Sequence, residues 1–101
     1  MPEFVRVARV KEIPAGSGRM FEVNGRQVAV FNVGGTFHAI DNRCEHQQGP
    51  LAEGDLDGCV VTCPWHGWTY DVTSGVSPDD AETHVDCFAV KVEGGEIFVA
   101  A

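Results

Sequence analysis

Two short segments of the sequence each pair a cysteine with a histidine. Cys44 and His46 are separated by one residue, Cys63 and His66 by two, and sixteen residues lie between the segments. Thiolate sulfur is a ligand that zinc and iron–sulfur sites select, and imidazole binds both zinc and iron. Two thiolates and two imidazoles therefore predict one metal centre, provided that the fold brings the two segments together.

Zinc is one candidate for this centre. Zinc fingers usually space their ligands C-x2-4-C and H-x3-5-H, so that like ligands are paired. Here each segment mixes one cysteine with one histidine, which disfavours zinc but leaves it as an alternative. Chance clustering of core residues is a second alternative, since small buried cysteines are common. The run Cys63-Pro64-Trp65-His66-Gly67-Trp68 is, however, typical of a loop and not of a core strand.

A wider pattern surrounds the two segments. They read Cys44-x-His46-x-x-Gly49-Pro50-Leu51 and Cys63-Pro64-x-His66-Gly67-Trp68. This pattern resembles the Rieske family, and the similarity extends from about Phe31 to Ala100. The resemblance implies one [2Fe–2S] cluster, with Cys44 and Cys63 on one iron and His46 and His66 on the other. It also implies an all-β, Rieske-like fold of three small antiparallel sheets, with two cluster-binding loops at one tip.

The resemblance also bears on the reduction potential. Histidine ligands leave the cluster less negative than four thiolates would, which raises Rieske potentials into a range of roughly −150 to +300 mV. High-potential members carry a disulfide between the loops and a serine donor, and the matching positions here are Gly49, Trp65 and Trp68. Tyr70 matches a family tyrosine whose hydroxyl reaches a cysteine sulfur. We therefore expect a potential near the bottom of the range, about −150 mV.

Other loop residues are candidates for supporting roles. Leu51, Trp65 and Trp68 are candidates to shield the cluster from water. Trp65 is equally a candidate contact for a partner, because tryptophan is enriched at interfaces. Backbone N–H groups in both loops are candidate donors to the sulfurs, namely those of Gln47, Gln48, Gly49, Trp65 and Gly67.

The remaining cysteines and histidines have simpler interpretations. Cys59 and Cys87 are expected to be core or strand residues and not a disulfide, and His38 to lie on a strand face. His84 with Asp86 and Glu82 is compatible with a mononuclear iron triad. The stretch is short and acidic, however, so a solvated surface is favoured there.

Short strands separated by glycine turns predict a single all-β domain over residues 1–101. Asn24-Gly25 is the strongest hairpin signal, and Gly34-Gly35 and Gly94-Gly95 mark further turns. No helix is expected. Both Cys/His segments would then lie on loops that follow strands. Strands are expected at residues 4–10, 20–23, 27–33, 36–41, 59–62, 69–72, 85–92 and 96–99.

Fifteen Asp and Glu against seven Lys and Arg give a net charge of −8. This charge disfavours nucleic acid and anionic membranes as partners and favours a basic protein. No apolar run approaches membrane length, and the start, Met-Pro-Glu-Phe-Val-Arg, lacks a signal pattern. We expect a cytoplasmic monomer whose thiols stay reduced.

The resemblance implies a one-electron carrier and not an enzyme, because the chain has no room for the mononuclear-iron catalytic domain of a Rieske oxygenase. It is similar to the soluble ferredoxin component of bacterial ring-hydroxylating dioxygenase systems. That similarity implies a flavoprotein reductase as electron donor, a terminal oxygenase as acceptor, and a place in aromatic hydrocarbon catabolism. Two alternatives stay open: the small Rieske-like subunit of NAD(P)H-dependent nitrite reductase, and a zinc-stabilised binding module.

Overall fold

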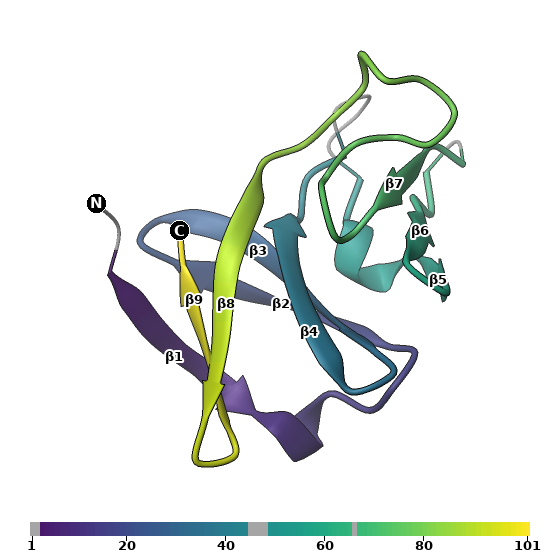
Figure 1. Cartoon of the computed structure of the whole chain (residues 1–101). Coiled ribbons are helices and arrows are strands. Elements are labelled where there is room, and N and C mark those ends of the chain that lie inside the picture. The colour runs from purple at the N-terminus through teal and green to yellow at the C-terminus, as the bar shows by residue number, and fades with distance from the viewer. Residues whose placement is uncertain (1–2, 45–48, 66) are drawn as a thin grey trace.

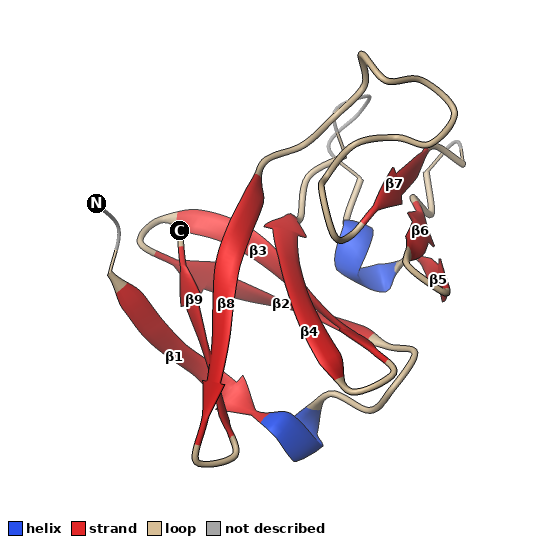
Figure 2. Cartoon of the chain, in the orientation of Figure 1, coloured by secondary structure: helices blue, strands red, loops and turns tan. Residues whose placement is uncertain are grey.

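The computed structural model describes residues 3–44, 49–65 and 67–101. Within these ranges most of the regular structure is β-strand, as the sequence predicts (Figure 2). The described ranges also contain two single 3-10 turns, η1 (Val10–Glu12) and η2 (Leu51–Glu53), which the sequence did not indicate. The strands are β1 (Phe4–Arg9), β2 (Gly18–Val23), β3 (Arg26–Val33), β4 (Thr36–Asp41), β5 (Asp55–Asp57), β6 (Val60–Thr62), β7 (Thr69–Asp71), β8 (Cys87–Glu93) and β9 (Glu96–Ala100).

The turn between β2 and β3 shows how a local signal sets strand register. Asn24 and Gly25 both have positive φ angles, 51° and 81°, which is the backbone conformation that a type I′ hairpin requires. The turn pairs Val23 with Arg26, and the ladder then continues without a shift to the pair Gly18 and Phe31. The predicted hairpin is therefore confirmed.

The described strands form two antiparallel sheets (Figure 1). The larger has the order β1-β9-β8-β4-β3-β2, and the smaller has the order β5-β6-β7. In the larger sheet, β4 and β8 are linked by two residue pairs, Ala39 with Phe88 and Ile40 with Cys87. This link makes two of the three small sheets that the family resemblance implies continuous with each other, and the expected all-β fold of small antiparallel sheets is confirmed.

The strand β3 separates the hydrophobic core into two clusters. Its side chains alternate between the two faces of the sheet, as side chains in any strand do. Val28 and Val30 belong to one hydrophobic cluster, with Ile97 and Val99 of β9, and Ala29 and Phe31 belong to the other. β3 is therefore buried on both faces and forms the wall between the two halves of the core.

The smaller sheet lies at one end of the larger one (Figure 1). Val61 of β6 pairs with Tyr70 of β7, and both side chains are fully buried. They pack in the same cluster as Phe31, and that cluster also contains Cys44 and Cys63. The core of the smaller sheet therefore continues directly into the two cysteines that the sequence singles out.

One expected strand begins later than predicted. β8 starts at Cys87, and not at Val85, because the N–H of Val85 donates to the Gly75 carbonyl in a loop, at 2.8 Å. Val85 is nevertheless buried against the smaller sheet, which explains its apolar character. In the described part of the chain, no helix has the length and apolarity needed to cross a membrane.

Candidate metal centre

Cys44 is positioned by a clamp at the end of β4. The buried Asn42 accepts two hydrogen bonds from the returning chain: its side-chain oxygen from the N–H of Ala52 at 2.8 Å, and its carbonyl from the N–H of Leu51 at 2.7 Å. The N–H of Cys44 donates to the Gly49 carbonyl at 2.9 Å. These bonds fasten both ends of the segment that carries the first pair of predicted ligands.

Asn42 is a site residue that the sequence analysis missed. A signal was available, because asparagine is disfavoured inside strands and here it stands directly after β4, two residues before Cys44. Its role depends on η2 returning to the same place, which a local pattern does not reveal.

Cys63 follows β6 directly. Its N–H donates to the carbonyl of Trp68 at 2.6 Å, just beyond the pairing of Thr62 with Thr69 that ends the β6–β7 ladder. The second ligand segment therefore spans the end of a hairpin, as predicted for a loop that follows a strand. Pro64, which opens that segment, is exposed.

The structure brings the two segments against each other at Gly49. A Cβ atom built on Gly49 would lie 2.6 Å from the Cys63 sulfur and 3.2 Å from the Trp65 Cβ. The first distance is shorter than any contact that a real Cβ atom makes. Glycine is therefore needed at position 49, where the backbone of the first segment lies directly against the second segment. The second distance is shorter than the Cβ separation of a disulfide, about 3.8 Å, but it shows that positions 49 and 65, which the resemblance matches to the disulfide of high-potential members, lie next to each other.

The two predicted cysteine ligands lie together in the core. Cys44 is 1% exposed and Cys63 is 2% exposed, and the two thiols are close enough that Cys44 raises the pKa of Cys63. Neither is in a disulfide, and the same holds for Cys59 and Cys87. Half of the predicted ligand set is therefore assembled by the described residues.

Two neighbouring groups interact with these sulfurs. The hydroxyl of Tyr70, which is fully buried, lies 3.2 Å from the Cys44 sulfur. The backbone N–H of Trp65 acts on the Cys63 sulfur by lowering the pKa of its thiol. The Tyr70 contact was expected from the sequence and is confirmed, and the role of the Trp65 N–H as a donor stays a prediction. Hydrogen bonds to cysteine sulfur are among the features that tune iron–sulfur sites.

The electrostatics of the free thiols follow from this burial. Loss of hydration raises the pKa of the Cys63 thiol; the Trp65 N–H lowers it, and the neighbouring Cys44 raises it further. Without metal, therefore, the Cys63 sulfur keeps its proton. Binding of a metal at the thiolates would release protons.

The predicted histidine ligands, His46 and His66, lie outside the described residues, and so do the candidate donors Gln47 and Gln48. No group of three His, Cys, Asp or Glu able to hold a metal occurs in the described ranges. The proposed triad of Glu82, His84 and Asp86 falls within those ranges, so this alternative is not supported.

The residues flanking the cysteines divide into buried and exposed ones. Leu51 is fully buried in the cluster with Cys44, and Trp68 is half-buried against it. Trp65 is 50% exposed, which favours its interpretation as a contact over that of a shield. His38 lies in β4 opposite Phe31 and is half-buried, as expected for a strand-face residue.

The donor set fits an iron–sulfur centre. Two adjacent buried thiols, a glycine that leaves room beside one of them, and a hydroxyl aimed at the other are present in the described residues. Zinc sites share thiolate ligands, so the thiol pair alone does not separate the two metals.

Comparisons with known proteins favour an iron–sulfur cluster over zinc. The family described as Rieske [2Fe–2S] domain matches residues 3–89. Ferredoxin CarAc of Metapseudomonas resinovorans is 33% identical over 96% of this chain and 92% of its own length. The ferredoxin component of the alkene monooxygenase system of Xanthobacter autotrophicus is 35% identical over 96% and 80% of the two chains.

Solved structures agree with the sequence relatives. The ferredoxin of carbazole 1,9a-dioxygenase from Nocardioides aromaticivorans superposes with a TM-score of 0.90, at 32% identity over 96% of both chains. A ferredoxin in complex with the oxygenase of carbazole 1,9a-dioxygenase gives a TM-score of 0.87, at 34% identity over 95% of this chain and all of that one.

Proposed function

The chain belongs to the Rieske [2Fe–2S] domain family, and on that premise we propose that it passes single electrons from a flavoprotein reductase to a terminal oxygenase. The matched relatives are named as ferredoxin components, and one solved relative is a ferredoxin bound to its oxygenase. These relatives favour a carrier over a nitrite reductase subunit. The family match likewise favours iron–sulfur over a zinc-stabilised module.

In this proposal Cys44 and Cys63 hold one iron, and His46 and His66 hold the other. A bound [2Fe–2S] cluster supplies a centre that takes up and releases one electron. The single observation that carries the proposal is the pairing of the two cysteine thiols in the core, 19 positions apart in sequence, with the Tyr70 hydroxyl aimed at the Cys44 sulfur.

The protein's own residues then adjust that centre. Tyr70 and the Trp65 N–H place positive hydrogen-bond dipoles at the two sulfurs, which stabilises the more negative, reduced form. Leu51 and Val61 surround the thiols with apolar atoms and keep water from them. We place the potential near the bottom of the Rieske range, about −150 mV, because Gly49, Trp65 and Trp68 stand where high-potential members carry a disulfide and a serine donor.

We further propose that residues 1–101 form one domain and that the protein works as a cytoplasmic monomer. A carrier has to meet two partners in turn, and redox encounters use small interfaces below about 1,200 Å². The exposed indole of Trp65, next to Cys63, is placed to contact such a partner. The names of the relatives make aromatic hydrocarbon catabolism the setting we propose.

A reconstituted electron-transfer chain tests the proposal. The purified protein, NADH and the flavoprotein reductase of an aromatic dioxygenase system are mixed without air, and the visible spectrum is followed. We expect reduction within seconds and reoxidation on adding the oxygenase, oxygen and its aromatic substrate. Cys63→Ser, which removes one ligand, should abolish transfer, whereas the matched control Cys87→Ser, which changes a cysteine on β8, should transfer electrons normally. Transfer that survives Cys63→Ser would contradict the proposal.

A further inference from the structure

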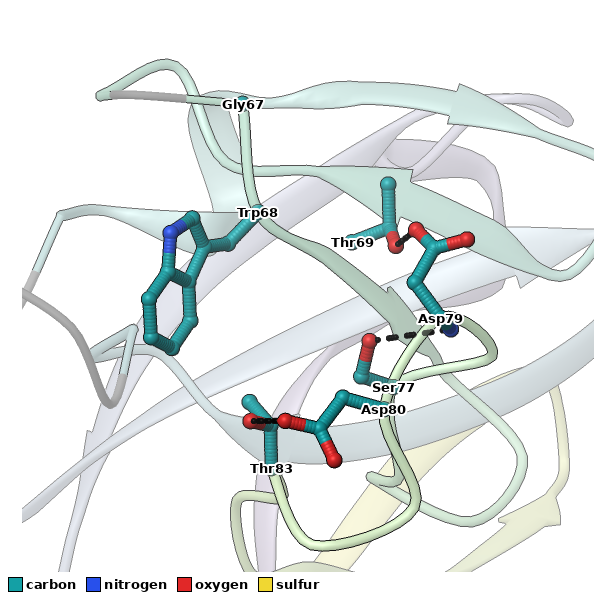
Figure 3. A pocket seen from close by; sticks show the side chains of 7 residues that line it. All are labelled: Gly67, Trp68, Thr69, Ser77, Asp79, Asp80 and Thr83. Atoms are coloured by element: carbon teal, nitrogen blue, oxygen red, sulfur yellow. Dashed lines mark hydrogen bonds between the residues drawn. The ribbon is translucent and has the colours of Figure 1, made fainter.

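A pocket of about 220 Å³ opens beside the second ligand segment (Figure 3). One side is formed by the indole of Trp68, and the other by the loop that contains Asp79, Asp80 and Thr83. Small-molecule sites have roughly 300–1,000 Å³, so this pocket is suited to the end of one side chain and not to a substrate. Its full lining is Gly67, Trp68, Thr69, Ser77, Asp79, Asp80 and Thr83.

The two carboxylates of the pocket are held in place. Asp79 accepts a hydrogen bond from the Thr69 hydroxyl at 2.6 Å, and its own N–H donates to the Ser77 hydroxyl at 3.2 Å. Asp80 accepts from the Thr83 hydroxyl at 3.1 Å and from the N–H of Glu82 at 3.0 Å. These donors fix the carboxylates without neutralising their charge.

The stretch of sequence that forms this pocket carries an excess of negative charge. Residues 44–90 contain nine of the fifteen Asp and Glu and none of the seven Lys and Arg. Of these nine, Asp86 is ion-paired with Arg26, at 2.5 Å. Among the residues that the structure describes, Asp79 and Asp80 have no ion pair with a Lys or Arg, although both are exposed.

The pocket is also tied to the proposed cluster ligands. Trp68, which forms one wall, accepts the hydrogen bond from the N–H of Cys63 at 2.6 Å. A group bound in the pocket would therefore contact Trp68, whose carbonyl is hydrogen-bonded to the backbone of the proposed ligand Cys63. Two carboxylates on the side of the pocket opposite the indole suit a cation, because they accept its N–H groups.

We propose that this pocket receives an arginine or lysine side chain of a redox partner protein and so seats that partner beside the cluster loop. The inference rests on the proposed function and adds to it the chemistry of the docking contact. The fixed acceptors and the absence of Lys and Arg from residues 44–90 both select a cation. Charge complementarity of this kind speeds encounter and fixes orientation.

The test uses a minimal version of the occupant. The oxidised, ¹⁵N-labelled protein is titrated with the peptide acetyl-Gly-Arg-Gly-amide, and amide shifts are followed by NMR. The same peptide with citrulline in place of arginine is the neutral control. We expect saturable shifts concentrated at residues 69 and 77–83 with the arginine peptide and none there with the citrulline peptide.

Two pairs of substitutions separate the pocket from general negative charge. Exposed ion pairs change affinity by about two- to fivefold each, so Asp79→Asn with Asp80→Asn should weaken peptide binding about tenfold. Asp55→Asn with Asp57→Asn, on β5, makes the same change in net charge outside the pocket and should leave binding unchanged. Thr83→Met fills the pocket without changing the charge and should also abolish the shifts. This variant tests the pocket independently if the substitutions at Asp79 and Asp80 disturb their loop.

Equal shifts with the citrulline peptide, or equal weakening by the β5 pair, would overturn the pocket proposal. The visible spectrum of the same sample shows separately whether the cluster is present. A protein with its cluster but without peptide binding would leave the carrier function standing. A protein without the cluster would instead contradict the carrier function, whatever the peptide does.

Discussion

The hydroxyl of Tyr70 lies 3.2 Å from the sulfur of Cys44, although 26 residues separate them in the sequence. Tyr70 reaches this position because β7 pairs with β6 inside the smaller sheet, while Cys44 arrives from the end of β4 in the larger one. The contact therefore forms only when the two sheets are packed together. It links the fold directly to the electronic properties of the proposed cluster.

Tyr70→Phe is expected to lower the reduction potential. The hydroxyl donates to a sulfur that becomes more electron-rich on reduction, so its loss destabilises the reduced form. A hydrogen bond contributes about 0.5–1.5 kcal/mol, which for one electron corresponds to about 20–60 mV. Protein-film voltammetry measures the shift. The control is Thr69→Val, which removes a hydroxyl bonded to Asp79 and should leave the reduction potential as it is. If Tyr70→Phe also has the potential of the parent protein, the contact does not act on the cluster.

Gly49→Ala is expected to impair cluster assembly. The new methyl group would lie 2.6 Å from the Cys63 sulfur and 3.2 Å from the Trp65 Cβ, so the two ligand segments must move apart. Iron and sulfide content per chain should fall severalfold. Gly58→Ala is the control, because its methyl group meets open space and only the positive φ of 61° costs stability, by roughly 1–2 kcal/mol. A full cluster complement in Gly49→Ala would contradict the close approach.

Cys87 provides a test of local electrostatics. Cys87 is an exposed residue, but partial loss of hydration around its sulfur raises the pKa of its thiol above the usual 9.0, and the negative charge of Asp71 raises it further. Asp71→Asn should therefore lower the pKa of Cys87 and speed its alkylation by iodoacetamide at pH 8, measured in a Cys59→Ser background. Asp57→Asn is the control for net charge. Equal alkylation rates in the two variants would show that Asp71 does not act on this thiol.

The raised pKa of Cys87 also determines how this thiol changes the stability of the fold with pH. Because the folded pKa of Cys87 lies above the unfolded value, the unfolded chain loses its proton first as the pH rises. The contribution of this thiol to stability is fully present below pH 9.0 and is lost as the pH rises through the folded pKa. Thermal unfolding between pH 8 and pH 10.5 should therefore fall less steeply with pH in Cys87→Ala than in the parent protein.

The uneven distribution of charge predicts where partners approach. Asp55→Lys on β5 and Glu93→Lys on β8 change the net charge equally, but only Asp55 lies in the stretch without Lys or Arg. At low salt, Asp55→Lys should slow reduction by the flavoprotein reductase by about two- to tenfold, and Glu93→Lys much less. Stopped-flow rates at 10 mM and 500 mM NaCl measure this, and the difference should vanish at high salt. Equal slowing by both variants would mean that net charge alone matters.

Much of the fold could be predicted from local signals. Asn24-Gly25 fixed one hairpin because its positive φ angles are a local requirement, and the turn at Gly34-Gly35 marked the start of the strand expected at residues 36–41, which agrees with β4. The pairing of β4 with β8 could not be predicted in this way, because Ile40 and Cys87 meet only through long-range packing. The η2 turn was missed for a related reason, since it depends on hydrogen bonds to Asn42.

The candidate site was predicted unevenly. Cys44, Cys63 and Tyr70 could be named in advance because their spacing and surroundings resemble a family pattern. The exposure of Trp65 could not, because a tryptophan in a loop is compatible with both shielding and contact, and its 50% exposure depends on how the two ligand segments pack. The pocket beside Trp68 joins residues from two loops, and composition alone does not show that they meet.

The electron paramagnetic resonance spectrum of the dithionite-reduced protein tests the central claim most directly. We predict a red-brown protein whose reduced signal has an average g value well below that of an all-cysteine [2Fe–2S] cluster, because two imidazoles on one iron make the cluster asymmetric. Integration should give about one spin per chain. A g average typical of four cysteine ligands, or a colourless protein with one zinc per chain, would contradict the assignment of Cys44, His46, Cys63 and His66 as the ligands of a Rieske cluster.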